Sequence, residues 1–282
     1  MNKKDSLGDR MKEFYENRSK LYLPRRVPVI IRLDGKAFHS FTKGFKRPYD
    51  EVFHKAMNRT LQYLCENIQG CKLGYTQSDE ITLLLTDYDT ITTDAWFGYG
   101  MQKVCSVAAS MATLKFNQAF RTAVNEETSG KEVDEYAVTL FKARDKGAMF
   151  DARCFSIPKE DVTNCFLWRQ QDATRNAIQM LGQCNFSHKE LQGKSCNEIQ
   201  DMLMTQKGIN FNDMPVEFKR GVCCYKTTRE ATCINKKTQK EVPCIRSEWV
   251  LDKEIPIFTQ DRTYIDKFVF TNNEENSKSI SI

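Results

Sequence analysis

The sequence predicts an α+β fold of the split βαβ, or ferredoxin-like, kind. Short apolar runs rich in β-branched residues, typical of buried strands, occur four times in the first half of the chain. Two stretches with apolar residues at every third or fourth position, typical of helices, separate them. The resulting order is strand, helix, strand, strand, helix, strand, and that alternation defines the predicted fold.

Each element of this half has its own signal. Asp50 is a suitable N-cap for the first helix of the core. The polar turn Ser78-Asp79-Glu80 joins two apolar runs, which predicts a hairpin. The expected elements are an N-terminal helix at 5–20, a strand at 27–33, a helix at 50–68, strands at 72–77 and 81–85, a helix at 97–120 and a strand at 148–157.

The second half predicts an additional helical and hairpin C-terminal region. Pro158 suits the first turn of a helix that extends to about Gly182. Capping boxes at Ser187–Glu190 and Ser195–Glu198 predict two short helices. Apolar and basic residues alternate at 219–249, which suggests a hairpin that turns at 235–237. A polar tail follows at 271–282. We therefore expect a core with its N-terminal helix at 1–157, and a region at 158–282 packed on it as one compact unit.

Composition excludes several classes of protein. Of the 282 residues, 40% are hydrophobic and 28% charged, as in an ordinary globular protein. The 42 basic and 37 acidic residues leave a net charge of only +5, so any polyanion site must be a local patch rather than a general coat. No apolar run approaches the ~20 residues of a membrane span, and the N-terminus lacks the apolar centre of a signal peptide. We expect a cytoplasmic protein without a membrane partner.

The eleven cysteines are odd in number, which in a cytosolic chain favours reduced thiols over disulfides. Cys223, Cys224, Cys233 and Cys244 raise the question of structural zinc. Their spacings do not form paired two-residue-gap ligand motifs, and adjacent cysteines begin a tetrahedral site poorly. Cysteines of a core or hairpin are the favoured interpretation.

Three acids point to metal chemistry. Asp34 ends the first strand, and Asp79 and Glu80 lie at the hairpin between the next two. In a split βαβ sheet the first and third strands are central neighbours, so these carboxylates can converge on Mg²⁺, and a pair of such ions supports in-line phosphoryl displacement. Polymerase palm domains share this order of elements. The alternatives are a simple Asp-Gly turn and a solvated hairpin tip.

The loop that follows Asp34 fits a triphosphate. Gly35 has no Cβ, so its backbone can approach a metal or phosphate closely. Successive backbone amides up to His39 would lie near the acids, and Lys36 and His39 add positive charge. The alternative is a lysine in solvent and a histidine packed at the base of the loop.

The segments around these acids resemble the tRNA-histidine guanylyltransferase family, and more specifically its bacterial and archaeal guanylyltransferase-like branch. The matching segments are Ile31–Phe41, Tyr75–Glu80, Phe150–Arg153 and Trp168–Asp172. The resemblance implies a palm-like catalytic core that adds nucleotides in the 3′-to-5′ direction to the 5′ end of a tRNA. The implied steps are activation of a 5′-monophosphate with ATP, attack by the 3′-hydroxyl of an incoming NTP, and release of the activating group.

The resemblance also implies roles for individual residues. Asp34, the Gly35 carbonyl and Asp79 would hold two Mg²⁺ ions, and Asp34, Asp79 and Glu80 would be the catalytic acids, with Glu80 ranked below Asp79 as a ligand. ATP, GTP or other NTPs would contact Asp34, Gly35, Lys36, Ala37, Phe38, His39, Ser78 and Asp79. A homotetramer is implied as well.

One departure from the family pattern affects the choice of tRNA. Members dedicated to histidine tRNA carry His-Ile-Asn-Asn-Leu-Tyr-Asn just after the Trp-Arg-Gln motif, where this chain has 173–178, Ala-Thr-Arg-Asn-Ala-Ile. Template-dependent repair of tRNA 5′ ends is therefore favoured over guanylylation specific to histidine tRNA. A palm-fold nucleotidyl cyclase acting on small nucleotides and a noncatalytic RNA-binding protein are the other hypotheses.

Basic residues provide candidate RNA contacts. Candidates for tRNA phosphates are Arg25, Arg26, Lys46 and Arg47, with further basic pairs at 219–220 and 236–237. Arg169 and Asn176 share a helical face with Asp172 and are candidates too. The alternative for that face is a solvated surface with an Asp172–Arg175 pair.

Overall fold

In a computed structural model, which describes residues 6–234 and 241–270, the core is one antiparallel sheet. The strand order in this part of the chain is β4-β1-β3-β2-β5-β6. The strands are β1 Val29–Gly35, β2 Cys71–Gln77, β3 Glu80–Leu85, β4 Phe150–Ser156, β5 Val222–Ile234 and β6 Glu241–Asp252. The first four have the predicted ferredoxin-like order, with β1 and β3 as central neighbours.

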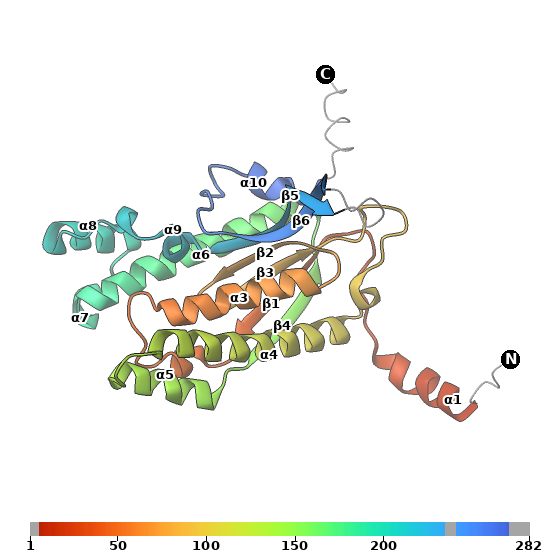
Figure 1. The fold of residues 1–282 in the computed structure, drawn as a ribbon, viewed down its shortest axis with the longest axis horizontal. Helices are drawn as coiled ribbons and strands as arrows, with labels where there is room; N and C mark the ends of the chain where they lie inside the picture. The colour runs from red at the N-terminus through yellow and green to blue at the C-terminus, as the bar shows by residue number, and fades with distance from the viewer. Residues whose placement is uncertain (1–5, 235–240, 271–282) are drawn as a thin grey trace, which may run out of the picture.

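One face of the sheet packs against helices α3 (Glu51–Asn67) and α4 (Met101–Thr128) (Figure 1). Alternation along β1 sends Val29, Ile31 and Leu33 into this layer, where all three are buried. Seven phenylalanines from the loop after β1, from α3 and α4 and from the start of β4 form a continuous ring cluster here. They are Phe38, Phe41, Phe45, Phe53, Phe116, Phe120 and Phe150.

The other face packs against helix α6 (Lys159–Asn185) and the short α10 (Thr263–Asp266). Ile30 of β1 and Leu84 of β3 point into this layer. Beyond the end of the sheet, α6 packs against the elements that follow it and forms a third apolar cluster. These elements are α7 His188–Leu191, α8 Cys196–Lys207, η3 Phe211–Asp213 and α9 Val216–Arg220. Both predicted capping boxes are present.

The hairpin of the second half joins the core sheet, which the sequence did not indicate. Residues 222–225 of β5 pair with 73–76 of β2, so the sheet runs without a break into the C-terminal region. Cys223 and Cys224 alternate across this strand and are fully buried, one in each layer. In the residues that the structure describes, no group of three or more His, Cys, Asp or Glu side chains is placed to hold a metal ion. The predicted turn at 235–237 and the tail at 271–282 lie outside the described residues.

Several boundaries differ from those expected. The helix predicted at 97–120 follows a short 3-10 segment, η2 Trp96–Tyr99, and continues to Thr128 because the apolar pattern persists to Val124. Helix α5 (Glu135–Lys146), capped by Asp134, was not predicted. The predicted helix at 5–20 divides into α1 Ser6–Phe14 and η1 Glu16–Ser19.

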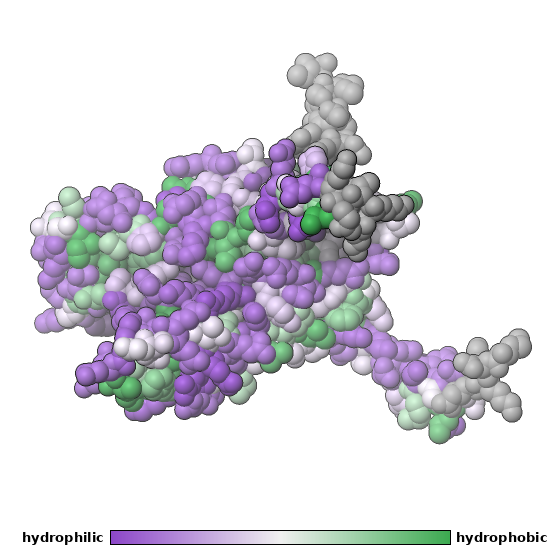
Figure 2. Space-filling view, in the orientation of Figure 1, coloured by the Kyte–Doolittle hydropathy of each residue, from purple (hydrophilic) through white to green (hydrophobic). Residues whose placement is uncertain are grey.

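Helix α1 projects away from the body of the protein, and none of its residues is buried (Figure 1). Figure 2 shows apolar residues on this projection, on a surface that is otherwise largely hydrophilic. Within residues 6–234 and 241–270, no helix is long and apolar enough to cross a membrane.

Asp50 is a buried anchor for the loop that leads into α3. It accepts hydrogen bonds from the Phe53 amide (2.9 Å), the Lys46 amide (3.0 Å) and the Tyr136 hydroxyl (2.8 Å). Asp50→Ala should therefore lower the free energy of unfolding by about 2–4 kcal/mol, measured by urea denaturation, since it removes a cap and leaves buried donors unpaired. Ser195→Ala, which removes an exposed cap, should cost only about 1 kcal/mol. Equal losses would contradict the anchoring role.

Candidate active site

The acids predicted to converge lie at one end of the two central strands. Asp34 on β1 is directly opposite Glu80 on β3, and it is also opposite Asp151 on β4. Asp79 occupies the tight β2–β3 turn immediately before Glu80. The antiparallel register therefore places four carboxylates at one edge of the sheet. Asp151 was not singled out from the sequence; its place at the start of the predicted 148–157 strand was the available signal.

This crowding changes the acidity of the two central acids. Burial, followed by the charges of Glu80 and Asp151, raises the pKa of Asp34 above its usual value. Burial, with help from the charges of Asp34 and Glu80, raises the pKa of Asp79 to about 6, against the lowering effect of its own amide and of the Ser78 hydroxyl. The charges of Arg153 and Arg32 offset the rise at Asp34 only in part. A hard cation would relieve both shifts; the described residues hold no group of three ligating side chains, but two carboxylates and the Gly35 carbonyl are oxygen donors of the kind that fits Mg²⁺.

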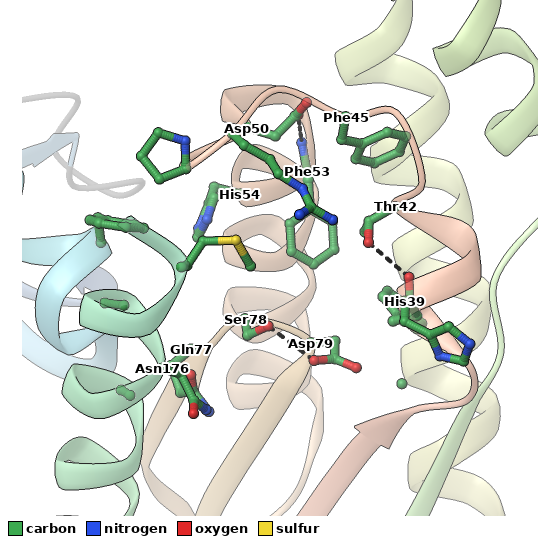
Figure 3. A pocket seen from close by; sticks show the side chains of 18 of the residues that line it. His39, Thr42, Phe45, Asp50, Phe53, His54, Gln77, Ser78, Asp79 and Asn176 are labelled. Carbon is green, nitrogen blue, oxygen red and sulfur yellow. Dashed lines mark hydrogen bonds between the residues drawn. The ribbon is translucent and has the colours of Figure 1, made fainter. Parts of the chain in front are cut away.

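A pocket of about 520 Å³ opens beside these acids, a volume suited to a small ligand (Figure 3). Its acidic end holds Asp34, Gly35, Ser78 and Asp79. In Figure 3 the carboxylate of Asp79, hydrogen-bonded to Ser78, points toward the side of the pocket formed by the loop after β1. The other lining residues are Ala37, Phe38, His39, Thr42, Phe45, Lys46, Arg47, Pro48, Asp50, Phe53, His54, Gln77, Ala173, Asn176, Ala177, Met180, Glu217 and Phe218.

The far end of the pocket has a different chemistry, which the sequence did not indicate. His54 projects from α3 and stacks on Tyr49, with ring centroids 4.0 Å apart. Burial lowers the pKa of His54 to about 4, although the charge of Glu217 opposes this effect, so the imidazole is neutral at pH 7. Phe218, which also lines the pocket, packs edge-on against Tyr49 with ring centroids 5.7 Å apart. The pocket therefore combines an acidic end with an end that presents stacked rings.

The loop after β1 is held by packing rather than by its charges. A Cβ on Gly35 would lie 2.2 Å from the Phe38 ring, so this position requires glycine, and the close approach is to a side chain. Ala37 adopts a left-handed conformation (φ 56°) that starts the short helix α2 (Phe38–Phe41). The Lys36 amide donates to the Met149 carbonyl (2.9 Å), so it is not one of the amides available to a phosphate.

Among the charged residues of this loop, His39 is exposed and lines the pocket, which corrects the alternative that it packs at the loop base. Lys36 is exposed outside the lining. Lys46 and Arg47 line the pocket instead, with Lys46 4.2 Å from the centroid of the Tyr136 ring. Positive charge therefore reaches the pocket from a later part of the loop than predicted.

Glu80 does not line the pocket. Its carboxylate accepts from Arg169 Nη1 at 2.6 Å and lies 3.5 Å from Arg32 Nη2. Arg169 is only 2% exposed and also bonds Asp172 at 2.6 Å. The guanidinium of Arg169, a predicted RNA contact, is therefore buried in an ion-pair network in this structure. Asp172 also pairs with Arg175, as the alternative for this face proposed.

The remaining candidates for RNA contacts separate into two regions. Asn176 lines the pocket beside Ala173 and Ala177. Arg25 and Arg26 precede β1 and are tied to Asp87, Arg25 through its side chain (2.5 Å) and Arg26 through its amide (2.8 Å). The part of β1 from Val29 to Asp34 alone separates them from that acid by roughly 17 Å of extended chain. A ligand that contacts both regions must be large.

The family model of tRNA(His) guanylyltransferase matches residues 8–158, which include the strands that carry Asp34, Glu80 and Asp151. The chain belongs to the tRNA(His) guanylyltransferase family. It is accordingly a nucleotidyltransferase, as the sequence predicted.

The chain has higher sequence identity to solved bacterial guanylyltransferase-like proteins than to the yeast tRNA(His) guanylyltransferase. A bacterial tRNA(His) guanylyltransferase-like protein in complex with ATP is 43% identical, with a TM-score of 0.75, over 94% of this chain and 100% of that one. A structure of such a bacterial protein in complex with GTP gives 40% identity and a TM-score of 0.74, over 95% and 100% of the two chains. The tRNA(His) guanylyltransferase of Saccharomyces cerevisiae is 27% identical over 207 residues, which are 68% of this chain and 80% of that protein.

The raised pKa of Asp79 carries a stability prediction for the metal-free protein. The carboxyl titrates near 3.8 when unfolded and near 6 when folded, so folding opposes its charge at pH 7. Asp79→Asn should raise the free energy of unfolding at pH 7 by about 1–2 kcal/mol in EDTA, with a full-shift limit of about 3 kcal/mol. The gain should shrink as the pH falls below about 6 and disappear near pH 3, where both states of the wild-type carboxyl are protonated. Urea denaturation at pH 7 and pH 3 measures this, and a full gain at pH 3 would contradict it.

Proposed function

We propose that the protein is a template-dependent 3′-to-5′ nucleotidyltransferase that adds nucleotides to the 5′ end of tRNA. The observation that carries this proposal is the pocket with Asp34 and Asp79 at one end and the stacked rings of His54 and Tyr49 at the other. That distribution suits a nucleoside triphosphate, whose metal-bound phosphates and base require opposite surroundings. Similar bacterial proteins have been solved with ATP and with GTP, which supports nucleotide binding here.

The acids would bind the triphosphate through metal ions, and the loop would contact its phosphates directly. Asp34, Asp79 and the carbonyl of Gly35 are the proposed ligands of two Mg²⁺ ions. Bound Mg²⁺ supplies neutralising charge for the phosphates and acidifies an attacking hydroxyl. Lys46 and Arg47 add positive charge along the pocket wall, and we assign them, with exposed His39, the phosphate contacts first expected of Lys36.

The lining of α6 supports repair of several tRNAs rather than one. Ala173, Asn176 and Ala177 reach the pocket from the segment that replaces the His-Ile-Asn-Asn-Leu-Tyr-Asn stretch of members dedicated to histidine tRNA. Small side chains there leave room beside the nucleotide and provide no anticodon-specific group. Guanylylation of histidine tRNA remains the alternative. The homotetramer, the cytoplasmic location and the division at residue 157 stay predictions.

Extension of RNA tests the proposed reaction. Incubation with a 5′-truncated tRNA, ATP, labelled NTPs and Mg²⁺ should add residues complementary to the acceptor strand. Asp34→Asn and Asp79→Asn should each reduce extension at least 1,000-fold while the fold is retained, because each removes a charged metal ligand. Asp89→Asn, which removes an acid from a surface pair with Lys72, should leave the rate within about twofold. Absence of any 5′ extension by the wild-type protein would refute the proposal.

Substitution of the anticodon tests the choice of tRNA. Truncated tRNAs that share an acceptor stem but carry histidine or phenylalanine anticodons should be extended with kcat/KM values within about threefold, since the pocket presents no anticodon-specific group. Dependence on the histidine anticodon by 100-fold or more would favour the guanylylation alternative. Turnover of NTPs that is independent of RNA would favour the cyclase.

A further inference from the structure

A half-exposed tryptophan lies beside the acids but outside the nucleotide pocket. Trp168 is on α6, and 49% of its surface is exposed. It is absent from the pocket lining, as are its neighbours Arg32 and Arg169. We refer to Trp168 with these two arginines as the Trp168 platform. An exposed tryptophan with a fixed ring is a typical surface for binding another flat group.

The ring of Trp168 is held in place from within the protein. The guanidinium carbon of Arg169 lies 3.7 Å from the ring centroid, and that of Arg32 lies 5.3 Å away. Arg169 is itself fixed by hydrogen bonds of 2.6 Å to both Glu80 and Asp172. Cation–π contacts to a buried, doubly bonded arginine restrict the indole before any ligand arrives. Less entropy is then lost when a base stacks on it.

The Trp168 platform is close to the reacting end of the sheet. Arg32 lies two residues before Asp34 on the same face of β1, a separation of about 7 Å. Glu80, which fixes Arg169, is the cross-strand partner of Asp34. A group stacked on Trp168 would therefore reach the acids from outside the pocket lining, which leaves the pocket to the incoming nucleotide.

A cation suited to a phosphate lies next to the platform. Arg153 on β4 is opposite Arg32, and its side chain is 56% exposed. Its partner in this structure is Asp151 at 3.2 Å, which is 59% exposed. Ion pairs this exposed contribute little to stability, so a phosphate can replace the carboxylate at small cost.

We propose that the Trp168 platform binds the 5′-terminal nucleotide of the RNA being extended, with its base stacked on Trp168 and its phosphate near Arg153. The inference rests on the proposed function and adds the site of the acceptor RNA. Stacking suits this role because every base has a π-face. An enzyme that repairs several tRNAs must hold whichever base is terminal after each addition, and base-specific hydrogen bonds would prevent that.

The test uses a truncated, 5′-monophosphorylated tRNA with 2-aminopurine as its 5′-terminal base. Binding to the wild-type protein should quench its fluorescence, whereas 2-aminopurine five nucleotides inward should be quenched much less. Trp168→Leu keeps apolar bulk but has no π-face, and should abolish the quenching and raise Kd and KM for the tRNA about 10-fold. Trp168→Phe should recover most of the affinity. Phe97→Ala removes another exposed aromatic with a lysine over its ring, and should change neither value.

Binding of GTP without RNA separates stacking from a structural role. Its Kd should be unchanged in Trp168→Leu, because Trp168 does not line the pocket, and a parallel loss of GTP affinity would overturn the platform as a separate site. Unchanged tRNA affinity and quenching in Trp168→Leu, or no quenching by the wild-type protein, would overturn the platform too. Wild-type quenching without extension would refute the proposed function and leave the platform standing. Extension by Trp168→Leu with an unchanged KM for the tRNA would overturn the platform and leave the proposed function in place.

Discussion

The concentration of negative charge at the end of the central strands is the constraint around which the site is arranged. Antiparallel register places Asp34 between Glu80 and Asp151, and the β2–β3 turn adds Asp79. Burial and the neighbouring negative charges oppose ionisation of Asp34 and Asp79. Glu80 is neutralised from within the protein by the buried Arg169, whereas Asp34 and Asp79 keep raised pKa values. The unrelieved charge is therefore confined to the two acids that face the pocket.

The site also depends on the cluster of seven phenylalanines described above, because this cluster holds the loop after β1 that forms one wall of the pocket. Phe38 packs with Phe41, Phe53, Phe116 and Phe150 at centroid distances of 5.1 to 6.0 Å. Its ring covers Gly35 so closely that a Cβ would collide with it. Hydrophobic packing thus holds a polar loop in place and leaves His39 and the cations of the loop free to face a ligand. The charges of the loop select its ligand, and the phenylalanines determine its shape.

The sequence predicted the parts of the fold that depend on local pattern. Apolar periodicity gave the core strands and helices, and their order placed β1 beside β3, which brought Asp34 and Glu80 together. Long-range pairings could not be predicted in this way, because local sequence pattern does not specify which strand is the partner. The pairing of Val222 with Thr76 is an example. The distinction between Glu80 and Asp79 also required the structure. Adjacent acids in a turn look alike until the partner of each, Arg169 or Ser78, is known.

Helix α6 connects the three parts of the site. Arg169 faces the sheet and neutralises Glu80, and about one and two turns later Ala173 and Asn176 line the pocket. Trp168, about 100° around the helix from Arg169, lies on the exposed side. A single rigid element therefore contacts the acids, the nucleotide pocket and the proposed RNA platform. Substitutions on different faces of α6 can change the RNA or the nucleotide that is accepted while Asp34 and Asp79 stay in place. In the proposed function, this separation of the acids from the residues on α6 would allow one proposed metal site to serve different RNA substrates.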